Sequence, residues 1–186
     1  MTRAARSTLA VDILVVSARW KKADRAKSIV RRAVTQAAAR TSANRTSTKP
    51  AELAILLTDD SGIRALNRDW RGIDKATNVL SFPAKNASDH LGDVVLAFET
   101  IAREARSERK PFAHHLAHLA VHGFLHLVGY DHERSKDAVA MERTEREILC
   151  ELAIPDPYRA AVAKVRLAPP ARKPSGGRAG KPRRHA

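Results

Sequence analysis

The segment PFAHHLAHLAVHGFLHLVGYDH, residues 111–132, joins a strongly apolar helical pattern to six of the eight histidines of the chain. Apolar residues fall on several sides of a helix drawn through residues 111–128, which predicts a central, buried helix rather than a surface one. Gly129 can adopt the left-handed backbone conformation that ends a helix. We therefore expect the fold to be built around this helix.

The spacing of the histidines predicts a metal site. His122 and His126 lie four residues apart, on one face of the helix and about 6 Å from each other. Past Gly129 the chain can turn back and bring His132 to the same point. Three imidazoles leave the fourth position of a tetrahedral zinc ion open for water, the arrangement of a catalytic site. We expect one zinc ion on His122, His126 and His132, although nickel and copper also accept three nitrogen ligands.

His118 competes for the same ion, because it lies four residues before His122. His118 and His126 are eight residues apart, about 12 Å along the helix axis, and cannot share one metal. The turn at Gly129 favours His126, so His118 is expected to orient a ligand or to pack. Asp131 fits either a role in orienting a ligand or a turn. Structural or solvent-facing roles are expected for His114, His115, Glu133, Glu142 and Glu145.

Apolar runs elsewhere in the chain predict the other elements. Strands are expected at residues 9–16, 52–58, 78–83 and 92–97, and helices at residues 20–40, 59–66, 111–128 and 135–152. Asp59, Asp60 and Ser61 are the N-cap candidates of the second helix, and Ser135 is the expected N-cap of the last. The polar residues 41–50 are typical of a loop. The pattern predicts an α+β fold, a single domain in which a small mixed four-stranded sheet packs with about five helices.

The formal net charge of +14 is concentrated at the two ends of the chain. Residues 1–50 carry 12 basic and 2 acidic side chains, residues 164–186 carry 8 basic and no acidic ones, and the stretch between them has a net charge of −4. The last segment is rich in Pro and Gly, so we expect a domain over residues 1–160 and a disordered basic tail over residues 161–186. The tail would either track a phosphate backbone or be a solvated appendage without a specific role.

Composition also excludes several classes of protein. Apolar residues make up 44% of the chain, which is enough for a core and argues against wholesale disorder. No apolar run approaches the roughly 20 residues that a membrane-spanning helix needs. Cys150 is the only cysteine and cannot form an internal disulfide. Asp12 interrupts the apolar run near the N-terminus, and no signal-peptide cleavage site follows it, so we expect a soluble, cytoplasmic protein without a membrane partner.

The order His122, His126, Gly129, His132 is similar to the pattern of the metzincin proteases, H-E-x-x-H-x-x-G-x-x-H. Gly123 stands where those proteases carry the glutamate that serves as general base. This difference argues against peptide hydrolysis by that route and leaves a metzincin-like metal helix. A zinc peptidase or another metal hydrolase is one alternative function, and it would need a base from elsewhere in the chain.

Residues 122–132 match the H-G-x-L-H-L-x-G-Y-D-H signature of the YbeY family of bacterial endoribonucleases, the rRNA maturation factors. Residues 66–83 resemble the family segment L-N-x-x-[YFW]-R-G-x-x-x-x-T-[DN]-V-L-S-F-P, and residues 91–95 resemble its L-G-D-I-x strand. The resemblance extends over roughly residues 9–155. It includes neither the basic tail nor most of the polar loop at residues 41–50.

The resemblance implies a metal-dependent endoribonuclease that cuts single-stranded RNA in 16S rRNA processing, especially at the 3′ end, and acts in ribosome quality control. It implies that His122, His126 and His132 bind zinc, and that Arg71 is a catalytic residue that contacts the substrate phosphate. A guanidinium suits that role, because it can bind two phosphate oxygens at once. The expected partners are an rRNA precursor and the ribosome or a ribosomal protein. A non-catalytic, ribosome-associated RNA-binding protein with a structural metal is the other alternative.

Overall fold

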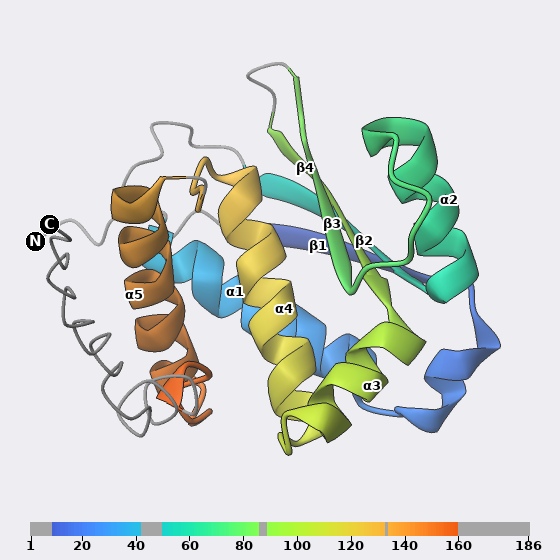
Figure 1. Ribbon diagram of the computed structural model, residues 1–186. Helices are drawn as coiled ribbons and strands as arrows, with labels where there is room; N and C mark the ends of the chain where they lie inside the picture. The colour runs from blue at the N-terminus through green and yellow to red at the C-terminus, as the bar shows by residue number, and fades with distance from the viewer. Residues whose placement is uncertain (1–8, 42–49, 86–88, 133, 160–186) are drawn as a thin grey trace, which may run out of the picture.

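The sheet consists of four strands that pair in the order β1-β2-β4-β3 (Figure 1). The strands are β1 (Leu9–Val15), β2 (Ala51–Thr58), β3 (Val79–Pro83) and β4 (His90–Ala97). β1, β2 and β4 run parallel to one another, and β3 is antiparallel to β4. The computed structural model describes residues 9–41, 50–85, 89–132 and 134–159. The mixed four-stranded sheet predicted from the sequence is confirmed.

The helix expected at the centre of the fold is α4 (Phe112–Leu127). It lies across β3 and β4 and packs against α1 (Ala26–Thr41), and α5 (Ser135–Glu151) packs against both helices (Figure 1). Leu116, Phe124 and Leu125 of α4 are at most 1% exposed. The apolar side chains on several sides of α4 therefore meet the sheet on one side and helices on the others, as the pattern of residues 111–128 predicts.

The opposite face of the sheet carries α2 (Asp60–Arg71), which packs on β3 and β4. Alternate residues of a strand point to opposite faces, so neighbouring side chains serve different layers. In β4, Val94 belongs to the core around α4, whereas Val95 packs with Ile63 of α2. Over β1 the same face is less covered, and Leu14 is 60% exposed. The whole is an α+β single domain.

The helix that follows β2 is longer than the sequence suggested. Of the three N-cap candidates, Asp59 takes the position and accepts a hydrogen bond from the N–H of Gly62 at 3.0 Å. The helix was expected to end at Leu66, but it continues to Arg71. Gly72, with φ of 71°, then takes the left-handed conformation and donates its N–H to the carbonyl of Arg68 at 3.0 Å. This glycine is the signal that ends the helix.

The helix expected at residues 20–40 begins later. Residues Ala18–Lys22 form a separate 3₁₀ helix, η1, and α1 starts only at Ala26. Trp20 explains the break, because its indole Nε1–H donates to the carbonyl of Thr58 at 2.7 Å. Its ring also packs edge-on against Phe98, with the ring centroids 5.3 Å apart. These contacts hold Trp20 against β2 and away from the axis of α1.

Two further details of the helices differ from the expectation. α3 (Phe98–Ser107) had no counterpart in the predicted order of elements, although buried Ile101 and Ala105 lie four residues apart on one face of it. Ser135 is the first residue of α5 rather than its N-cap, and Arg134 takes the cap position without a side-chain hydrogen bond.

The expected tail at residues 161–186 and most of the loop at residues 41–50 lie outside the described residues. Within the described residues, no helix combines the length and apolar character needed to cross a membrane.

A partly buried set of polar side chains joins α3 and α4 to the loop before β3. The Glu104 carboxylate lies 2.9 Å from Nε2 of His115, and the side-chain amide of Asn78 donates to it, also at 2.9 Å. Burial raises the pKa of Glu104, but the hydrogen bonds from His115 and Asn78 outweigh it and bring the pKa below its ordinary value. Glu104 is therefore ionised and stabilises this junction at neutral pH.

We expect Glu104→Gln to lower the free energy of unfolding by about 1 kcal/mol at pH 7, because a carboxylate with two hydrogen bonds is lost. A carboxyl group whose pKa is depressed by folding adds stability above its unfolded pKa, about 4.3, and loses it as the pH falls through the folded value. Urea unfolding at several pH values should show that the variant and the wild type become more alike in free energy of unfolding as the pH falls below about 4.3. A difference in the free energy of unfolding that stays constant down to pH 3 would contradict this role of Glu104. The matched control is Glu108→Gln, which removes an exposed carboxylate.

Candidate metal centre

Three histidine side chains converge at the C-terminal end of α4. One ring nitrogen from each of His122, His126 and His132 lies within 4.8 Å of the other two. His122 and His126 come from successive turns of α4, and their Nε2 atoms are 3.1 Å apart. Gly129 has a φ of 92° and turns the chain back, so that His132 reaches the same point. The structure thus brings together the three residues that the spacing of the sequence selected.

The outer ring nitrogens of two of these histidines face groups that only accept hydrogen bonds. Nδ1 of His122 lies 2.8 Å from a carboxylate oxygen of Glu145, and Nδ1 of His126 lies 3.0 Å from the backbone carbonyl of Tyr130. Since a carboxylate and a carbonyl cannot donate, each Nδ1 carries the hydrogen. When both rings are neutral, their Nε2 atoms present lone pairs to each other across 3.1 Å.

This arrangement fits a metal ion. Two facing lone pairs repel each other unless a cation or a proton lies between them. Two nitrogens bound to tetrahedral zinc at about 2.1 Å lie about 3.4 Å apart, close to the separation seen here. Burial, together with the neighbouring His122 and His132, lowers the pKa of His126. His126 therefore stays neutral, and able to bind a metal, below the ordinary imidazole pKa of about 6.5.

Glu145 belongs to this site, and the expectation of a structural or solvent-facing role missed its contact with a metal-site histidine. Its side chain is fully buried between α5 and α4. Burial raises the pKa of Glu145, but hydrogen bonds from His118, His122 and Tyr158 outweigh it and hold the pKa at about 2. A signal was present in the sequence, because Glu145 lies on the same helix face as the buried residues Met141 and Ile148.

The other histidines and carboxylates take supporting positions. His118 is not part of the triad, and its Nε2 lies 3.3 Å from Glu145, the carboxylate that also faces His122. Asp131 accepts a hydrogen bond from the backbone N–H of His132 at 2.7 Å, which is a turn contact. His115 is buried against Glu104, as described above, and Glu142 pairs with Arg146 at 2.9 Å. Both therefore have structural roles, whereas Glu133 lies outside the described residues.

Arg71 is the last residue of α2 and is exposed. α2 and α4 lie on opposite faces of the sheet, with the edge strand β3 between them (Figure 1). Arg64 and Arg68, on the same helix, pair with Asp74 and Asp69 at 2.7 Å and 2.9 Å. Arg71 makes no ion pair or hydrogen bond with any described residue. Among the described residues its guanidinium has no partner, and its exposure leaves it accessible to an external anion.

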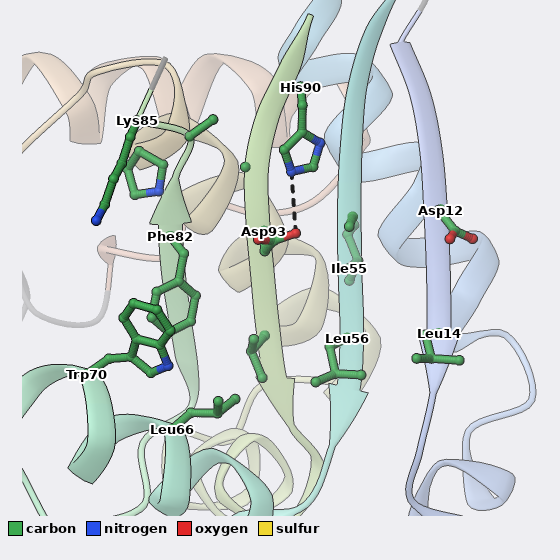
Figure 2. A pocket seen from close by; sticks show the side chains of 15 residues that line it. Asp12, Leu14, Ile55, Leu56, Leu66, Trp70, Phe82, Lys85, His90 and Asp93 are labelled. Atoms are coloured by element: carbon green, nitrogen blue, oxygen red, sulfur yellow. Dashed lines mark ion pairs between the residues drawn. The ribbon is translucent and has the colours of Figure 1, made fainter. Parts of the chain in front are cut away.

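A hollow of about 500 Å³ lies on the sheet face that carries α2 (Figure 2). Its wall includes Trp70, which is 68% exposed and meets the ring of Phe82 with the centroids 5.8 Å apart. Leu56 and Leu14 contribute to an apolar floor, and polar side chains such as Asp93 also line the hollow. Because the triad is at the end of α4, on the other face, this hollow is separate from the metal centre.

Comparison with known proteins agrees with these features. Residues 15–153 match the family model described as Endoribonuclease YbeY. A relative named Endoribonuclease YbeY from Rhodopseudomonas palustris (strain BisB18) is 55% identical over 157 residues, which cover 80% of this chain and 92% of the relative. One of the same name from Nitrobacter hamburgensis is 54% identical over 158 residues, 80% of this chain and 82% of the relative.

A solution structure of a protein from Thermotoga maritima matches with a TM-score of 0.47 and 21% identity, over 88% of this chain and 99% of that one. The family assignment rests instead on the sequence matches, which include the segment that carries the converging histidines. The length of the family match and the identity to its members establish that this chain belongs to the YbeY endoribonuclease family.

Proposed function

We propose that this protein is a zinc-dependent endoribonuclease that cuts single-stranded RNA during ribosomal RNA processing. The observation that carries the proposal is the convergence of three histidine nitrogens in a member of the YbeY family. The Nδ1 atoms of His122 and His126 donate to Glu145 and to the Tyr130 carbonyl, which leaves each Nε2 as the nitrogen available to a metal. The donor set of three imidazoles suits zinc and leaves a coordination position for water or substrate.

Different side chains would bind the metal, orient a ligand and contact the substrate. A zinc ion on the triad would supply a Lewis acid and a water molecule of lowered pKa. His122, His126 and His132 would hold that ion, and Glu145 keeps the ring of His122 in one orientation. Arg71, at the end of α2, would contact a phosphate of the same RNA strand, as the family resemblance implies. The free guanidinium of Arg71 supports this assignment.

We expect Arg71→Glu to retain zinc and to cut RNA roughly 10²-fold more slowly, because one charge-assisted phosphate contact becomes a repulsion. Mass spectrometry would measure the zinc content of the variant, and single-turnover cleavage of a labelled RNA would measure its cleavage rate. Arg68→Glu is the matched control, since Arg68 lies one turn earlier on α2 and pairs with Asp69. Equal losses in the two variants would show that Arg71 has no specific role.

The proposed substrate is an rRNA precursor, in particular the 3′ end of 16S rRNA, with the ribosome or a ribosomal protein as partner. Ribosome quality control in the cytoplasm would follow from the same activity. The test is cleavage of a labelled 16S 3′ precursor beside the same sequence annealed to a complementary strand. We expect the single strand to be cut and the duplex to be spared, with both reactions stopped by a chelator. An uncut single strand in the presence of zinc would contradict the proposal.

The two alternative functions are less well supported. A zinc peptidase needs a general base beside the metal, yet Gly123 occupies that position and a Cβ there would meet Val94 at 2.9 Å. Glu145 cannot replace the base from where it lies, because it contacts the outer nitrogen of His122. Peptidase activity on a denatured protein would support this alternative. RNA binding that weakens with salt but gives no cleavage would support a non-catalytic RNA-binding protein.

A further inference from the structure

Glu145 lies at the centre of a buried hydrogen-bond network behind the metal centre. One of its carboxylate oxygens faces Nδ1 of His122 at 2.8 Å. The other accepts a hydrogen bond from the hydroxyl of Tyr158 and lies 3.3 Å from Nε2 of His118. The carboxylate is fully buried, and each of its oxygens has a partner that comes from α4 or from the C-terminal part of the domain.

Tyr158 is itself fixed by several contacts. Its backbone N–H donates to the side chain of Asp156 at 2.8 Å, and the guanidinium carbon of Arg146 lies 4.9 Å from the centre of its ring. Arg146 also pairs with Asp156 at 3.5 Å. On the other side, Lys110 donates to the carbonyl of Pro157 at 2.9 Å. The segment of residues 156–158 is thus attached both to α5 and to the turn before α4.

We propose that Glu145 is a positioning residue for the metal centre and that Tyr158 holds its carboxylate in place. The inference rests on the metal site of the proposed function. A neutral imidazole has two tautomers, and its ring can turn about the bond to Cβ. By accepting the Nδ1 hydrogen of His122, Glu145 selects the tautomer whose Nε2 lone pair faces His126 and makes that nitrogen more basic.

Tyr158 adds to the metal centre a residue that lies far from the histidines in the sequence. The family model matches residues 15–153, so Tyr158 lies beyond the matched stretch. The signature histidines and Tyr158 are nevertheless joined through a single carboxylate. The loss of one hydroxyl group at Tyr158 should therefore change the metal affinity of a site on α4.

The test is titration of the metal-free full-length protein with zinc, in competition with a chelating indicator, and with cobalt followed by its visible absorption. We expect Glu145→Gln to weaken zinc binding by about 10–100-fold and to change the spectrum of bound cobalt. Tyr158→Phe, which removes one hydrogen bond, should weaken zinc binding by roughly 2–10-fold. Glu147→Gln is the matched control on the same helix, because Glu147 pairs with Arg40 and Arg143 at the surface. It should bind both metals as the wild type does.

The outcomes separate this proposal from the proposed function. Zinc affinities of Glu145→Gln and Tyr158→Phe within twofold of the wild type, with unchanged cobalt spectra, would overturn it. If Glu145→Gln does not fold, as judged by circular dichroism of the metal-free protein, Tyr158→Phe alone decides the result. Metal binding is measured without RNA, so a wild-type protein that binds zinc and leaves RNA uncut would overturn the nuclease function and not this inference.

Discussion

His126→Ala should abolish tight zinc binding and RNA cleavage together. His126 supplies one of three converging nitrogens, and its Nε2 lies 3.1 Å from that of His122. Two imidazoles alone make a much weaker site, so the zinc affinity should fall by roughly 10²-fold or more. Cleavage of single-stranded RNA should fall at least as far, because the chemistry depends on the bound ion. Zinc content after dialysis and single-turnover cleavage would measure the two losses on one preparation.

His114→Ala is the matched control for this prediction. His114 lies near the start of the same helix and takes no part in the triad. The control variant should keep both its zinc and its activity. Retained cleavage in His126→Ala protein that has been shown to lack zinc would contradict the assignment of the metal centre.

Gly92→Ala should destabilise the fold by about 2–5 kcal/mol, which combines the strain of an unusual backbone conformation with a steric clash. Gly92 lies in β4 opposite Pro83 and has a φ of 128°. A Cβ atom at this position would lie 2.2 Å from the backbone carbonyl oxygen of Phe82. Because the obstacle is backbone, β3 and β4 would have to move apart. The loss is a large part of the roughly 5–15 kcal/mol that stabilises a typical domain.

Gly72→Ala provides the comparison for Gly92→Ala. Gly72 also has a positive φ, 71°, but a Cβ there would have nothing within 4 Å. Only the conformational strain applies, so the expected loss is about 1 kcal/mol. Urea unfolding of both variants would separate strain from clash, and equal losses would show that the close approach at Gly92 does not matter.

The metal centre could be predicted from the sequence because its geometry is local. His122, His126 and His132 lie within eleven residues, and helical spacing followed by a glycine turn sets their positions. The sheet and α4 could also be predicted from the sequence, since each strand and the central helix have a clear apolar pattern. In these cases the local sequence and the tertiary structure favour the same conformation.

The contacts that were missed depend on residues distant in the sequence. Glu145 follows His122 by 23 residues, and only the packing of α5 on α4 brings the two side chains together. Trp20 interrupts the expected helix because it binds the carbonyl of Thr58, 38 residues away. Helical propensity and spacing contain no information about such partners. For Arg71, the role comes from the family resemblance, because an exposed arginine at the end of a helix has no local pattern that distinguishes it from other surface arginines.

The positive charge of the N-terminal part of the chain is partly structural. Arg31 donates to the carbonyl of Val11 at 2.7 Å, and Arg40 forms ion pairs with Glu147 and Glu151. These side chains attach α1 to β1 and to α5. Some of the basic side chains of residues 1–50 therefore have a role in holding the fold together.

RNA cleavage should depend on one metal ion bound by the histidine triad. The most direct measurement is cleavage of a single-stranded RNA by protein stripped with a chelator and then supplied with increasing amounts of zinc. We predict no cleavage by the stripped wild type, a rise that saturates at one zinc per chain, and no recovery in His126→Ala. Full activity in protein shown to be metal-free would contradict the account.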